Sequence, residues 1–330
     1  MMPDPAKPFS PCAIAAVAIG RNEGDRLIRC LDSLIRAGLD HIVYVDSGST
    51  DASVAEARSR GVTVVELDMT RPFTAARARN AGVAALPAGG QGIDHIQFID
   101  GDCIMQPDWI QAAADFLNDT PQAAVACGRL REMAPEASLY NRLIDREWET
   151  PIGRTRSCGG IAMIRVEAFR AVGGFDPSLI AGEEPELCLR LRAAGWQIWR
   201  LDAEMARHDA AMHRFGQWWR RTRRGGYAYA LGAALHGKAP ERHNVAQARR
   251  ALIWGLFLPL AALLGAVLVH PALSLLLLAF PVQIARLWRR DRDLAHAAFL
   301  VLGKFPEALG VLEYRFRRLT GQAGRLIEYK

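Results

Sequence analysis

The sequence lacks both of the glycine-rich phosphate loops that mark many nucleotide-binding enzymes. No G-x-G-x-x-G follows the first apolar run, and no G-x-x-x-x-G-K-[ST] occurs anywhere in the 330 residues. The first motif cradles the pyrophosphate of a dinucleotide, and the second cradles the phosphates of a nucleoside triphosphate. Their absence argues against a Rossmann dehydrogenase and against a P-loop kinase.

Paired cysteines are absent as well. The six cysteines stand singly, without a C-x-x-C pair and without a Cys/His cluster at the spacing of zinc ligands. This pattern indicates a reducing compartment in which the thiols serve as small buried residues. After an N-terminal tail at residues 1–11, residues 12–20 form an apolar run that is too short and too poorly flanked for a convincing signal peptide. We predict a buried strand there.

Acidic residues are scarce toward the C-terminal end. Residues 1–204 hold 21 Lys/Arg against 28 Asp/Glu, whereas residues 205–330 hold 20 against 7, so the formal charge of +6 combines an acidic body with a basic tail. Half of the residues are apolar and 23% are charged, which excludes a disordered or collagen-like chain. The length predicts two domains, or one large domain with an appendage.

Short apolar runs rich in Val and Ile predict the first strands. They are bounded by Gly, Asp or Asn and lie at residues 13–19, 41–45, 62–67 and 95–99. Segments with helical spacing, such as residues 25–37 and 52–60, separate the first three runs. Continuous apolar strands alternating with helices predict an α/β fold, with a mainly parallel sheet covered by helices on both faces.

Charged residues are absent from residues 251–285, a run of 35 residues. As one helix this run would extend about 50 Å, well beyond the roughly 30 Å hydrocarbon core of a bilayer. His270 and Pro271 stand near its middle, so we expect a helical hairpin within residues 241–292, either spanning the membrane or re-entering on one side. Arginines flank both ends, which favours a cytoplasmic position for the flanks. A soluble helical bundle is the alternative, although soluble helices rarely lack charge for so long.

The remaining residues, 293–330, mix large apolar side chains with basic ones. This composition predicts an interfacial amphipathic helix or pair of helices. Because the basic tail coincides with the apolar hairpin, its charge favours contact with anionic membrane lipid and gives no evidence for nucleic acid.

Two aspartates, Asp100 and Asp102, follow the fourth predicted strand with one glycine between them. In parallel sheets the ligand crevice lies at the carboxyl ends of the strands. Carboxylates there can hold a hard divalent cation such as Mg²⁺ or Mn²⁺, which in turn holds a diphosphate. A D-x-D pair also occurs by chance in loops, where it only caps a turn. The pair alone leaves both interpretations open.

The D-x-D pair belongs to an ordered set of segments, which narrows the choice. The set comprises residues 18–23 (AIGRNE), 45–51 (VDSGSTD), 78–82 (ARNAG), the pair itself, 173–176 (GGFD) and 182–191 (GEEPELCLRL). In this order the segments resemble the family 2 glycosyltransferases of GT-A fold, over roughly residues 12–235. The resemblance implies a GT-A domain at residues 12–240, with a nucleotide-sugar half at 12–102 and an acceptor half at 103–240, and an inverting sugar transfer.

Matching positions within these segments imply the donor and metal residues. The donor-binding residues implied by the resemblance are Arg21, Asn22, Glu23, Asp46, Arg79 and Asp100. Asp46 matches the aspartate that hydrogen-bonds the nucleobase, while Asp100 is expected at the ribose or the metal. The implied ligands of Mg²⁺ or Mn²⁺ are Asp102, Asp100 and His208. Helix capping by Asp46 and packing by Arg79 are the structural alternatives.

A general base is expected at Glu183 or Glu184. A sugar hydroxyl is a weak nucleophile at neutral pH, so a carboxylate must take its proton as the new bond forms. The family pattern usually reads Glu-Asp here, whereas this chain reads Glu-Glu. Glu184 is therefore one methylene longer than the matching aspartate. We assign Glu184 as the base with Glu183 as the next candidate; a charged helix N-terminus is the structural alternative.

The acceptor side is expected to include Gly159, Gly160, Gln217, Trp218 and Arg220. The spacing of Gln217 and Arg220 is similar to the Q-x-x-R-W signature of processive polysaccharide synthases. Arg221 stands where that signature has tryptophan, which puts processive synthesis in doubt. The aromatic and arginine side chains here would bind an acceptor or dock the domain on anionic lipid.

These expectations describe an inverting glycosyltransferase on the cytoplasmic face of the membrane. It would move one sugar from a nucleoside-diphosphate sugar to a glycan or lipid-linked acceptor, in the synthesis of a cell-surface polysaccharide or glycolipid. A catalytically silent GT-A scaffold in a polysaccharide assembly complex is the alternative, although the acidic residues Asp100, Asp102 and Glu184 argue against it. A sugar-nucleotide pyrophosphorylase would need a glycine-rich phosphate loop that residues 20–24 do not supply.

Overall fold

The computed structural model describes residues 13–39 and 41–322. The tail expected at residues 1–11 and the first cysteine, Cys12, lie outside the described residues. The chain divides into two compact units. The first contains the described residues up to Pro135 together with Ile144–Leu179 and Glu183–Ala210. The second contains Glu136–Leu143, Ile180–Gly182 and the described residues from Ala211 onward. The helix after Ala211 thus groups with the C-terminal helices, whereas we expect from the sequence that the catalytic domain extends to residue 240.

A nine-stranded mixed sheet forms the centre of the first unit. Its strands are β1 (Ile14–Gly20), β2 (His41–Asp46), β3 (Thr63–Glu66), β4 (His95–Asp100), β5 (Cys103–Met105), β6 (Ala123–Glu132), β7 (Gly153–Thr155), β8 (Ala162–Arg165) and β9 (Gln197–His208). The strand order is β3-β2-β1-β4-β8-β6-β9-β5, with β7 also paired to β9. The first four strands are parallel, β8 is antiparallel to both of its neighbours, and β9 is parallel to β6. The predicted α/β class is confirmed, and the four predicted strands are β1 to β4.

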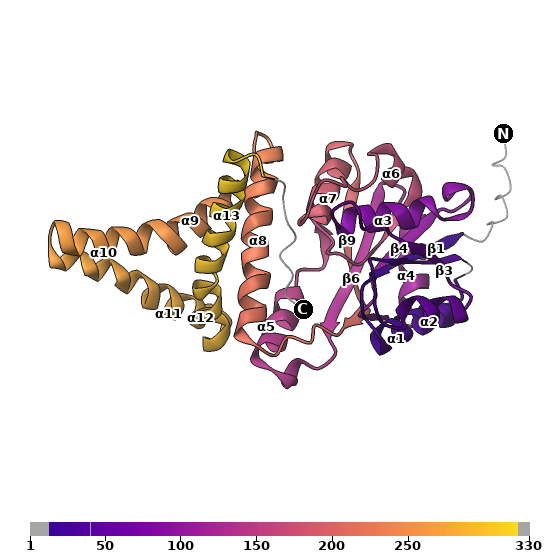
Figure 1. The fold of residues 1–330 in the computed structure, drawn as a ribbon, viewed down its shortest axis with the longest axis horizontal. Helices are drawn as coiled ribbons and strands as arrows, with labels where there is room; N and C mark the ends of the chain where they lie inside the picture. Colours follow the sequence, from indigo (N-terminus) through magenta and orange to yellow (C-terminus); the bar gives the residue numbers. More distant parts are fainter. Residues whose placement is uncertain (1–12, 40, 323–330) are drawn as a thin grey trace, which may run out of the picture. The chain divides into compact units, whose positions relative to one another are not determined.

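Helices cover the two faces of this sheet. They are α1 (Asp25–Arg36), α2 (Ser53–Ser59), α3 (Ala75–Ala84), α4 (Trp109–Asp119), α6 (Val166–Ala171) and α7 (Glu183–Ala193), with a short 3₁₀ turn η1 (Pro87–Gly89). In Figure 1, α1 and α2 lie below the sheet, and α3 and α6 lie above it. Because both faces are covered, the central residues of β1 are all buried, which explains its uninterrupted apolar sequence. The boundary between the two units falls within two further elements, a second 3₁₀ turn η2 (Pro135–Ala137) and helix α5 (Leu139–Trp148), so that each of them is shared between the units.

The second unit consists of helices. They are α8 (Phe215–His236), α9 (Val245–Leu252), the π-helical η3 (Ile253–Phe257), α10 (Leu258–Leu268), the 3₁₀ segment η4 (Pro271–Leu278), α11 (Ala279–Asp291), α12 (Leu294–Leu302) and α13 (Lys304–Leu319). The chain reverses at His270, whose Nδ1 accepts a hydrogen bond from the Ala272 amide at 3.1 Å. The expected hairpin is therefore present, and its arms join at the His-Pro pair.

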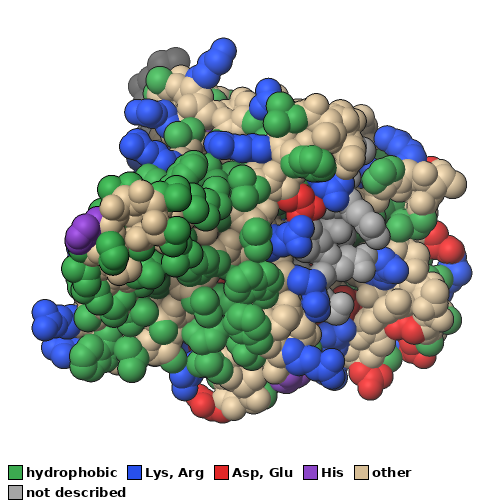
Figure 2. Space-filling model, turned by 60° about the vertical axis from the view of Figure 1, so that its left-hand side comes forward, with side chains coloured by type: hydrophobic (Ala, Val, Ile, Leu, Met, Phe, Trp, Pro, Cys, Tyr) green, Lys and Arg blue, Asp and Glu red, His purple; other side chains and the backbone are tan. Residues whose placement is uncertain are grey.

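Three continuous helical stretches of this unit are long and apolar enough to cross a membrane. They are Val245–Leu268, Pro271–Asp291 and Leu294–Leu319. No residue in the apolar window of the second stretch is buried, and Val267 at the tip of the first is 82% exposed. Figure 2 shows the resulting broad surface of hydrophobic side chains. Such a surface would be costly in water, so this unit is suited to contact with lipid.

The third stretch packs more tightly than the other two. A Cβ on Gly310 of α13 would overlap the carbonyl of Arg223 on α8, and a Cβ on Gly226 would overlap the carbonyl of Glu307, so the two backbones cross in direct contact. Glu313 adds ion pairs to Arg223 at 2.7 Å and to Arg317 at 3.1 Å. Close approach through glycine is a common way for apolar helices to associate in membranes. The predicted pair of tail helices, α12 and α13, is thus an integral part of the helical unit.

Candidate functional site

The carboxyl ends of three neighbouring strands bring the predicted donor residues to one edge of the sheet. Asp46, at the end of β2, lies in register with Gly20 of β1, and Asp100, at the end of β4, lies in register with Ile19. The two carboxylates therefore leave the sheet on either side of β1. This edge is the usual ligand position in an open parallel sheet.

Asp46 holds the turn that follows β2. It is buried, and its Oδ2 accepts hydrogen bonds from the amides of Gly48 at 2.9 Å and Ser49 at 2.8 Å. Its Oδ1 accepts a hydrogen bond from the Tyr44 hydroxyl at 2.9 Å. A carboxylate has about four acceptor positions, so three of them are occupied and one is left for a ligand. Contact of Asp46 with a nucleobase stays a prediction.

Asn22 joins the first loop to this turn. The backbone amide of Asn22 donates to Ser49 Oγ at 2.8 Å, and its side-chain Oδ1 accepts from the backbone amide of Thr50 at 2.7 Å. Asn22 has a left-handed backbone with φ 54°, which asparagine tolerates better than most residues. Glu23 forms an ion pair with Arg26 at 2.8 Å, while Arg21 is exposed. Of the three residues, Asn22 is the one with hydrogen bonds to this turn. Binding of a donor by any of the three stays a prediction.

Arg79 is the charged centre of the site. Its side chain is 3% exposed and donates from Nη2 to Asp100 at 2.9 Å and from Nη1 to Glu183 at 2.8 Å. Burial works to lower the pKa of Arg79, but the charges of Asp100 and Glu183 outweigh it and raise that pKa. Arg79 therefore remains a cation and fixes two predicted site carboxylates from distant parts of the chain.

Gly160 leaves the space that this ion-pair network needs. A Cβ at Gly160 would lie 3.0 Å from Arg79 Nη2 and 3.5 Å from Asp100 Oδ2. Its neighbour Gly159 is exposed and adopts φ 83°, a conformation that favours glycine. Both glycines therefore lie at the site for steric reasons, and their predicted contact with an acceptor is untested.

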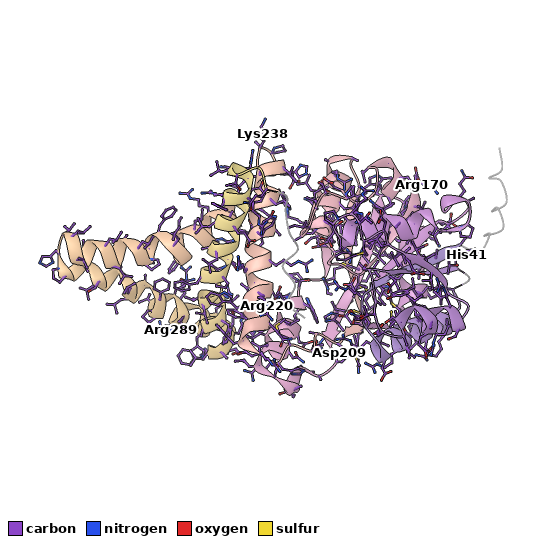
Figure 3. All side chains as sticks on the ribbon, in the orientation of Figure 1. His41, Arg170, Asp209, Arg220, Lys238 and Arg289 are labelled. Atoms are coloured by element: carbon purple, nitrogen blue, oxygen red, sulfur yellow. The ribbon has the colours of Figure 1, made fainter. Side chains whose placement is uncertain are left out.

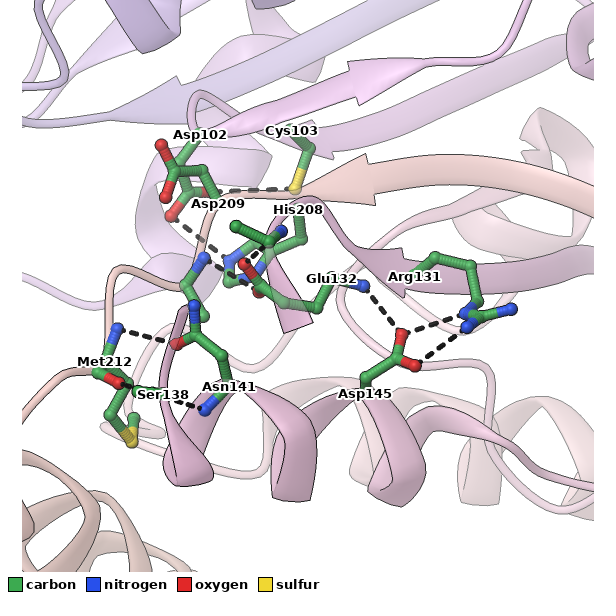
Figure 4. Close-up of polar contacts among 12 residues, drawn as sticks. Asp102, Cys103, Arg131, Glu132, Ser138, Asn141, Asp145, His208, Asp209 and Met212 are labelled. Atoms are coloured by element: carbon green, nitrogen blue, oxygen red, sulfur yellow. Dashed lines mark hydrogen bonds and ion pairs between the residues drawn. The ribbon is translucent and has the colours of Figure 1, made fainter. Parts of the chain in front are cut away.

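The side chains of Asp102 and His208 lie close together, as expected for two ligands of one cation. Asp102 Oδ2 lies 3.2 Å from His208 Nε2, and Asp102 is nearly buried (Figure 4). Two ligand atoms at right angles on a cation with bonds of about 2.1 Å are separated by about 3 Å, so this pair fits Mg²⁺ or Mn²⁺. A carboxylate and an imidazole also suit Mn²⁺ chemically. The third predicted ligand, Asp100, lies outside the group of mutually close ligand atoms that contains Asp102 and His208.

Two side chains that we did not single out from the sequence surround His208. Glu132 Oε2 lies 3.9 Å from His208 Nδ1, and the Glu132 carboxylate is held by the amides of Ala134 and Ala210. Trp148 contacts the imidazole edge to face, with 5.0 Å between ring centroids. At 3.9 Å the Glu132 carboxylate is too far for a hydrogen bond and acts on the imidazole through its negative charge, while the Trp148 ring limits the orientation of the imidazole.

We therefore expect Glu132→Gln to weaken metal binding. The amide keeps the size of the side chain but removes the negative charge 3.9 Å from His208. Loss of an outer carboxylate that is hydrogen-bonded to a ligating histidine costs about 10- to 100-fold in metal affinity, and at this longer distance we expect the lower end, about 10-fold. Titration with Mn²⁺ followed by electron paramagnetic resonance measures this affinity without turnover. Glu149→Gln, an exposed glutamate next to Trp148, is the matched control and should bind Mn²⁺ like the unmodified protein.

Glu184 points one carboxylate oxygen into a buried cluster. Its Oε1 accepts hydrogen bonds from the Cys158 amide at 2.5 Å and from the Cys188 thiol at 3.1 Å. The hydrogen bond with Cys188, together with burial, raises the pKa of the Cys158 thiol, so the thiol stays protonated. Cys188 lies one helical turn after Glu184 on α7 and thus shares its face. These contacts accommodate the extra methylene that distinguishes Glu184 from an aspartate.

The two glutamates of α7 have different surroundings. Glu183 is paired with the Arg79 guanidinium, which neutralises its charge. Glu184 Oε2 has no hydrogen-bond partner among the described residues, and Glu184 as a whole is 8% exposed. An oxygen without a protein partner is available to accept a proton from a bound hydroxyl. The geometry favours Glu184 as the base, and its assignment remains a prediction.

Three predicted acceptor residues lie in the second unit, on α8. Gln217 caps the helix: its Oε1 accepts from the amides of His213 at 2.9 Å and Arg214 at 3.0 Å. Trp218 is buried and packs edge to face on Phe299, with 4.8 Å between ring centroids. Arg220 is exposed on the same helix (Figure 3). These contacts give Gln217 and Trp218 structural roles, and an acceptor role for any of the three stays a prediction.

Comparison with known proteins identifies the class that this fold and site define. Residues 17–173 match the model of the glycosyl transferase family 2, and residues 142–214 match a model described as the N-terminal domain of galactosyltransferase. Residues 17–173 are therefore a glycosyltransferase family 2 domain, built on a GT-A-like sheet. The resemblance noted in the sequence is confirmed.

Particular relatives agree with this class. The chain is 30% identical over 173 residues to the succinoglycan biosynthesis protein ExoA of Rhizobium meliloti, covering 49% of this chain and 51% of that protein. It is 28% identical over 200 residues to the pre-mycofactocin glycosyltransferase of Mycobacterium tuberculosis, covering 57% and 41%. The chain thus spans about half the length of the curated relatives it matches.

A solved structure supports the fold along most of the chain. The mannosyltransferase PcManGT from Pyrobaculum calidifontis, in complex with GDP-Man and Mn²⁺, aligns over 92% of this chain and 88% of its own, with a TM-score of 0.64 and 20% identity. At this identity the likeness establishes the shared GT-A-like architecture.

Proposed function

We propose that this protein is an inverting glycosyltransferase that moves a single sugar from a nucleoside-diphosphate sugar to a hydroxyl of a glycan or lipid-linked acceptor. The observation that carries the proposal is the approach of Asp102 Oδ2 to His208 Nε2 at 3.2 Å, at the strand edge where a nucleotide would bind. Asp102 and His208 would hold Mg²⁺ or Mn²⁺, and that cation would neutralise the departing diphosphate. The Mn²⁺ bound to PcManGT supports this choice.

The other residues of the site have separate proposed roles in donor binding and in proton transfer. Asp46 holds the turn after β2, Asn22 joins the loop after β1 to that turn, and Arg79 holds Asp100 at the proposed donor site. Glu184 Oε2 takes the proton of the acceptor hydroxyl while the acceptor oxygen bonds to C1 and the bond from C1 to the diphosphate oxygen breaks. One displacement on the face opposite the leaving group inverts the configuration at C1. No protein nucleophile is required.

We place the acceptor in cell-surface polysaccharide or glycolipid synthesis on the cytoplasmic side of the membrane. The relative whose name refers to succinoglycan biosynthesis supports a polysaccharide. The three apolar helical stretches support a membrane site for the reaction. Arginines at both ends of the hairpin, Arg249 and Arg250 before it and Arg286 and Arg289 after it, favour the cytoplasmic face.

The experiment that tests the function is a panel of nucleotide sugars. Each donor is incubated with the full chain and Mg²⁺ or Mn²⁺, and both donor hydrolysis and the shift in thermal unfolding are measured. A glycosyltransferase should hydrolyse at least one donor slowly and lose this activity with excess chelator. A silent scaffold would hydrolyse none of them under any condition, and that result would overturn the proposal.

Membrane attachment gives a separate prediction. We expect the full chain to stay with the membrane in high salt and in carbonate, because the hairpin exposes apolar rather than charged side chains. Leu263→Arg combined with Leu264→Arg should release much of it, since each arginine near the centre of a span costs about 2.5–3.5 kcal/mol. Both leucines are more than half exposed. Fractionation measures the outcome, with Ile152→Arg on the first unit as control.

Release by salt would contradict the prediction that the apolar hairpin attaches the protein to the membrane. Release of the unmodified protein by salt alone would show that only its basic surface holds it to lipid.

A further inference from the structure

Three buried side chains beside the proposed base form a cluster that the function does not use. Cys158, Glu184 and Cys188 each offer a ligand atom, and these atoms all lie within 4.8 Å of one another. Cys158 precedes β8 by a few residues, while Glu184 and Cys188 come from α7. The separation in sequence explains why no zinc-ligand spacing is visible in the chain.

The distances approach those of a tetrahedral thiolate site. The two sulfurs are 3.5 Å apart, whereas two sulfurs on a tetrahedral Zn²⁺ with bonds of about 2.3 Å are separated by about 3.8 Å. Cys188 Sγ lies 3.1 Å from Glu184 Oε1, against about 3.5 Å for a sulfur and an oxygen on the same ion. Small side-chain adjustments would therefore admit the ion.

We propose that Cys158, Cys188 and Glu184 bind a thiophilic divalent cation, such as Zn²⁺ or Cd²⁺, and that this binding inhibits the enzyme. Two thiolates select such ions over Mg²⁺ and Mn²⁺, which prefer the oxygen and imidazole ligands at Asp102 and His208. The thiols lose their protons to solvent as the two metal–sulfur bonds form. Glu184, 8% exposed, is the member through which the ion enters.

Inhibition follows from the shared glutamate. The inhibitory part of the inference rests on the proposed role of Glu184 as base, because a cation on Oε1 withdraws negative charge from the same carboxylate and weakens Oε2 as a proton acceptor. The metal would also displace the Cys158 amide from Glu184 Oε1 and so disturb the loop that carries Gly159 and Gly160. The binding part stands independently of any turnover.

The test uses Cd²⁺ as the probe on the full chain, with Mg²⁺ in large excess to occupy the other site. Binding to thiolates produces a sulfur-to-cadmium absorption band, which should saturate at one equivalent. Cys158→Ser and Cys188→Ser should each abolish or strongly reduce the band. Cys30→Ser and Cys103→Ser, which alter buried thiols outside the cluster, should leave it unchanged. The Cys103 control matters because that thiol lies 3.5 Å from Asp102 Oδ1.

A second measurement protects the test against variants that fail to fold. X-ray absorption of the unmodified protein loaded with one equivalent of Zn²⁺ should show two sulfur ligands at about 2.3 Å. Absence of sulfur ligands, or a cadmium band that survives both Cys158→Ser and Cys188→Ser, would overturn the site. In transfer assays, Cys188→Ser should need at least about ten times more Zn²⁺ for half-inhibition than the unmodified protein. If the ion binds but no donor is ever turned over, the proposed function fails and the metal site stands.

Discussion

Replacing Glu184 by glutamine should lower sugar transfer by about 10²- to 10⁴-fold, the usual contribution of a positioned general base. Glutamine keeps the length of the side chain and can still accept the hydrogen bond from the Cys158 amide, but it cannot take a proton. Donor affinity and Mn²⁺ affinity should persist, because the proposed donor and metal contacts are made by Asp46, Asp102 and His208. Steady-state kinetics and donor titration by calorimetry separate the two effects.

Three further variants make this result specific. Glu184→Asp keeps the carboxylate at a shorter reach and should lose less activity than the amide. Glu167→Gln, an exposed glutamate on α6, should behave like the unmodified protein. Glu183→Gln removes the negative charge that is paired with Arg79. It should mainly lower thermal stability, since the buried guanidinium then loses one of its two anionic partners. If Glu183→Gln abolished transfer while Glu184→Gln retained it, the base would be Glu183.

The parallel half of the sheet could be predicted from the sequence because its signals are local. Each of β1 to β4 is an apolar run bounded by turn residues, and α1 carries a buried stripe at Leu27, Leu31 and Leu34. The antiparallel half has weaker local signals. β6 and β9 are long, their register is irregular, and they pair residues about 75 positions apart in the sequence. The sequence predicted that half only through its resemblance to the family 2 glycosyltransferases.

The same distinction applies to the site. Motif residues at strand ends were predictable, because the end of a parallel strand fixes where a side chain emerges. The partners that hold them were not. Glu132 and Trp148 reach His208 from β6 and α5, and Cys158 reaches Glu184 from a loop, and none of the three stands in a recognisable pattern. Contacts of this kind depend on the packed structure, so one sequence without an alignment does not reveal them.

The helical unit shows what composition alone can and cannot predict. A run without charge predicts an apolar hairpin, and the structure has one. The packing of α13 on α8 depends instead on where glycines face each other, at Gly226 and Gly310. Mixed apolar and basic composition is compatible both with an interfacial helix and with a helix packed in a bundle. The sequence therefore predicted the helices of the tail but not their close contact with α8.

Asp102→Asn should abolish metal-dependent transfer while the protein keeps its fold. The amide keeps the shape of the side chain beside His208 but removes the negative ligand, so binding of Mg²⁺ and Mn²⁺ should fall below detection. A cation on the leaving diphosphate supplies several kcal/mol of transition-state stabilisation, so its loss should cost at least about 10²- to 10³-fold in rate.

Metal titration, donor hydrolysis and thermal unfolding of Asp102→Asn should be measured together with Asp108→Asn. Asp108 is exposed a few residues further along the chain and makes no side-chain capping bond to α4, so the same substitution there should change none of the three quantities. His208→Ala should reproduce the loss of metal affinity seen in Asp102→Asn, because each residue supplies one of two adjacent ligands. Full transfer activity in Asp102→Asn, or in the unmodified protein with excess chelator, would show that the D-x-D pair does not carry the metal.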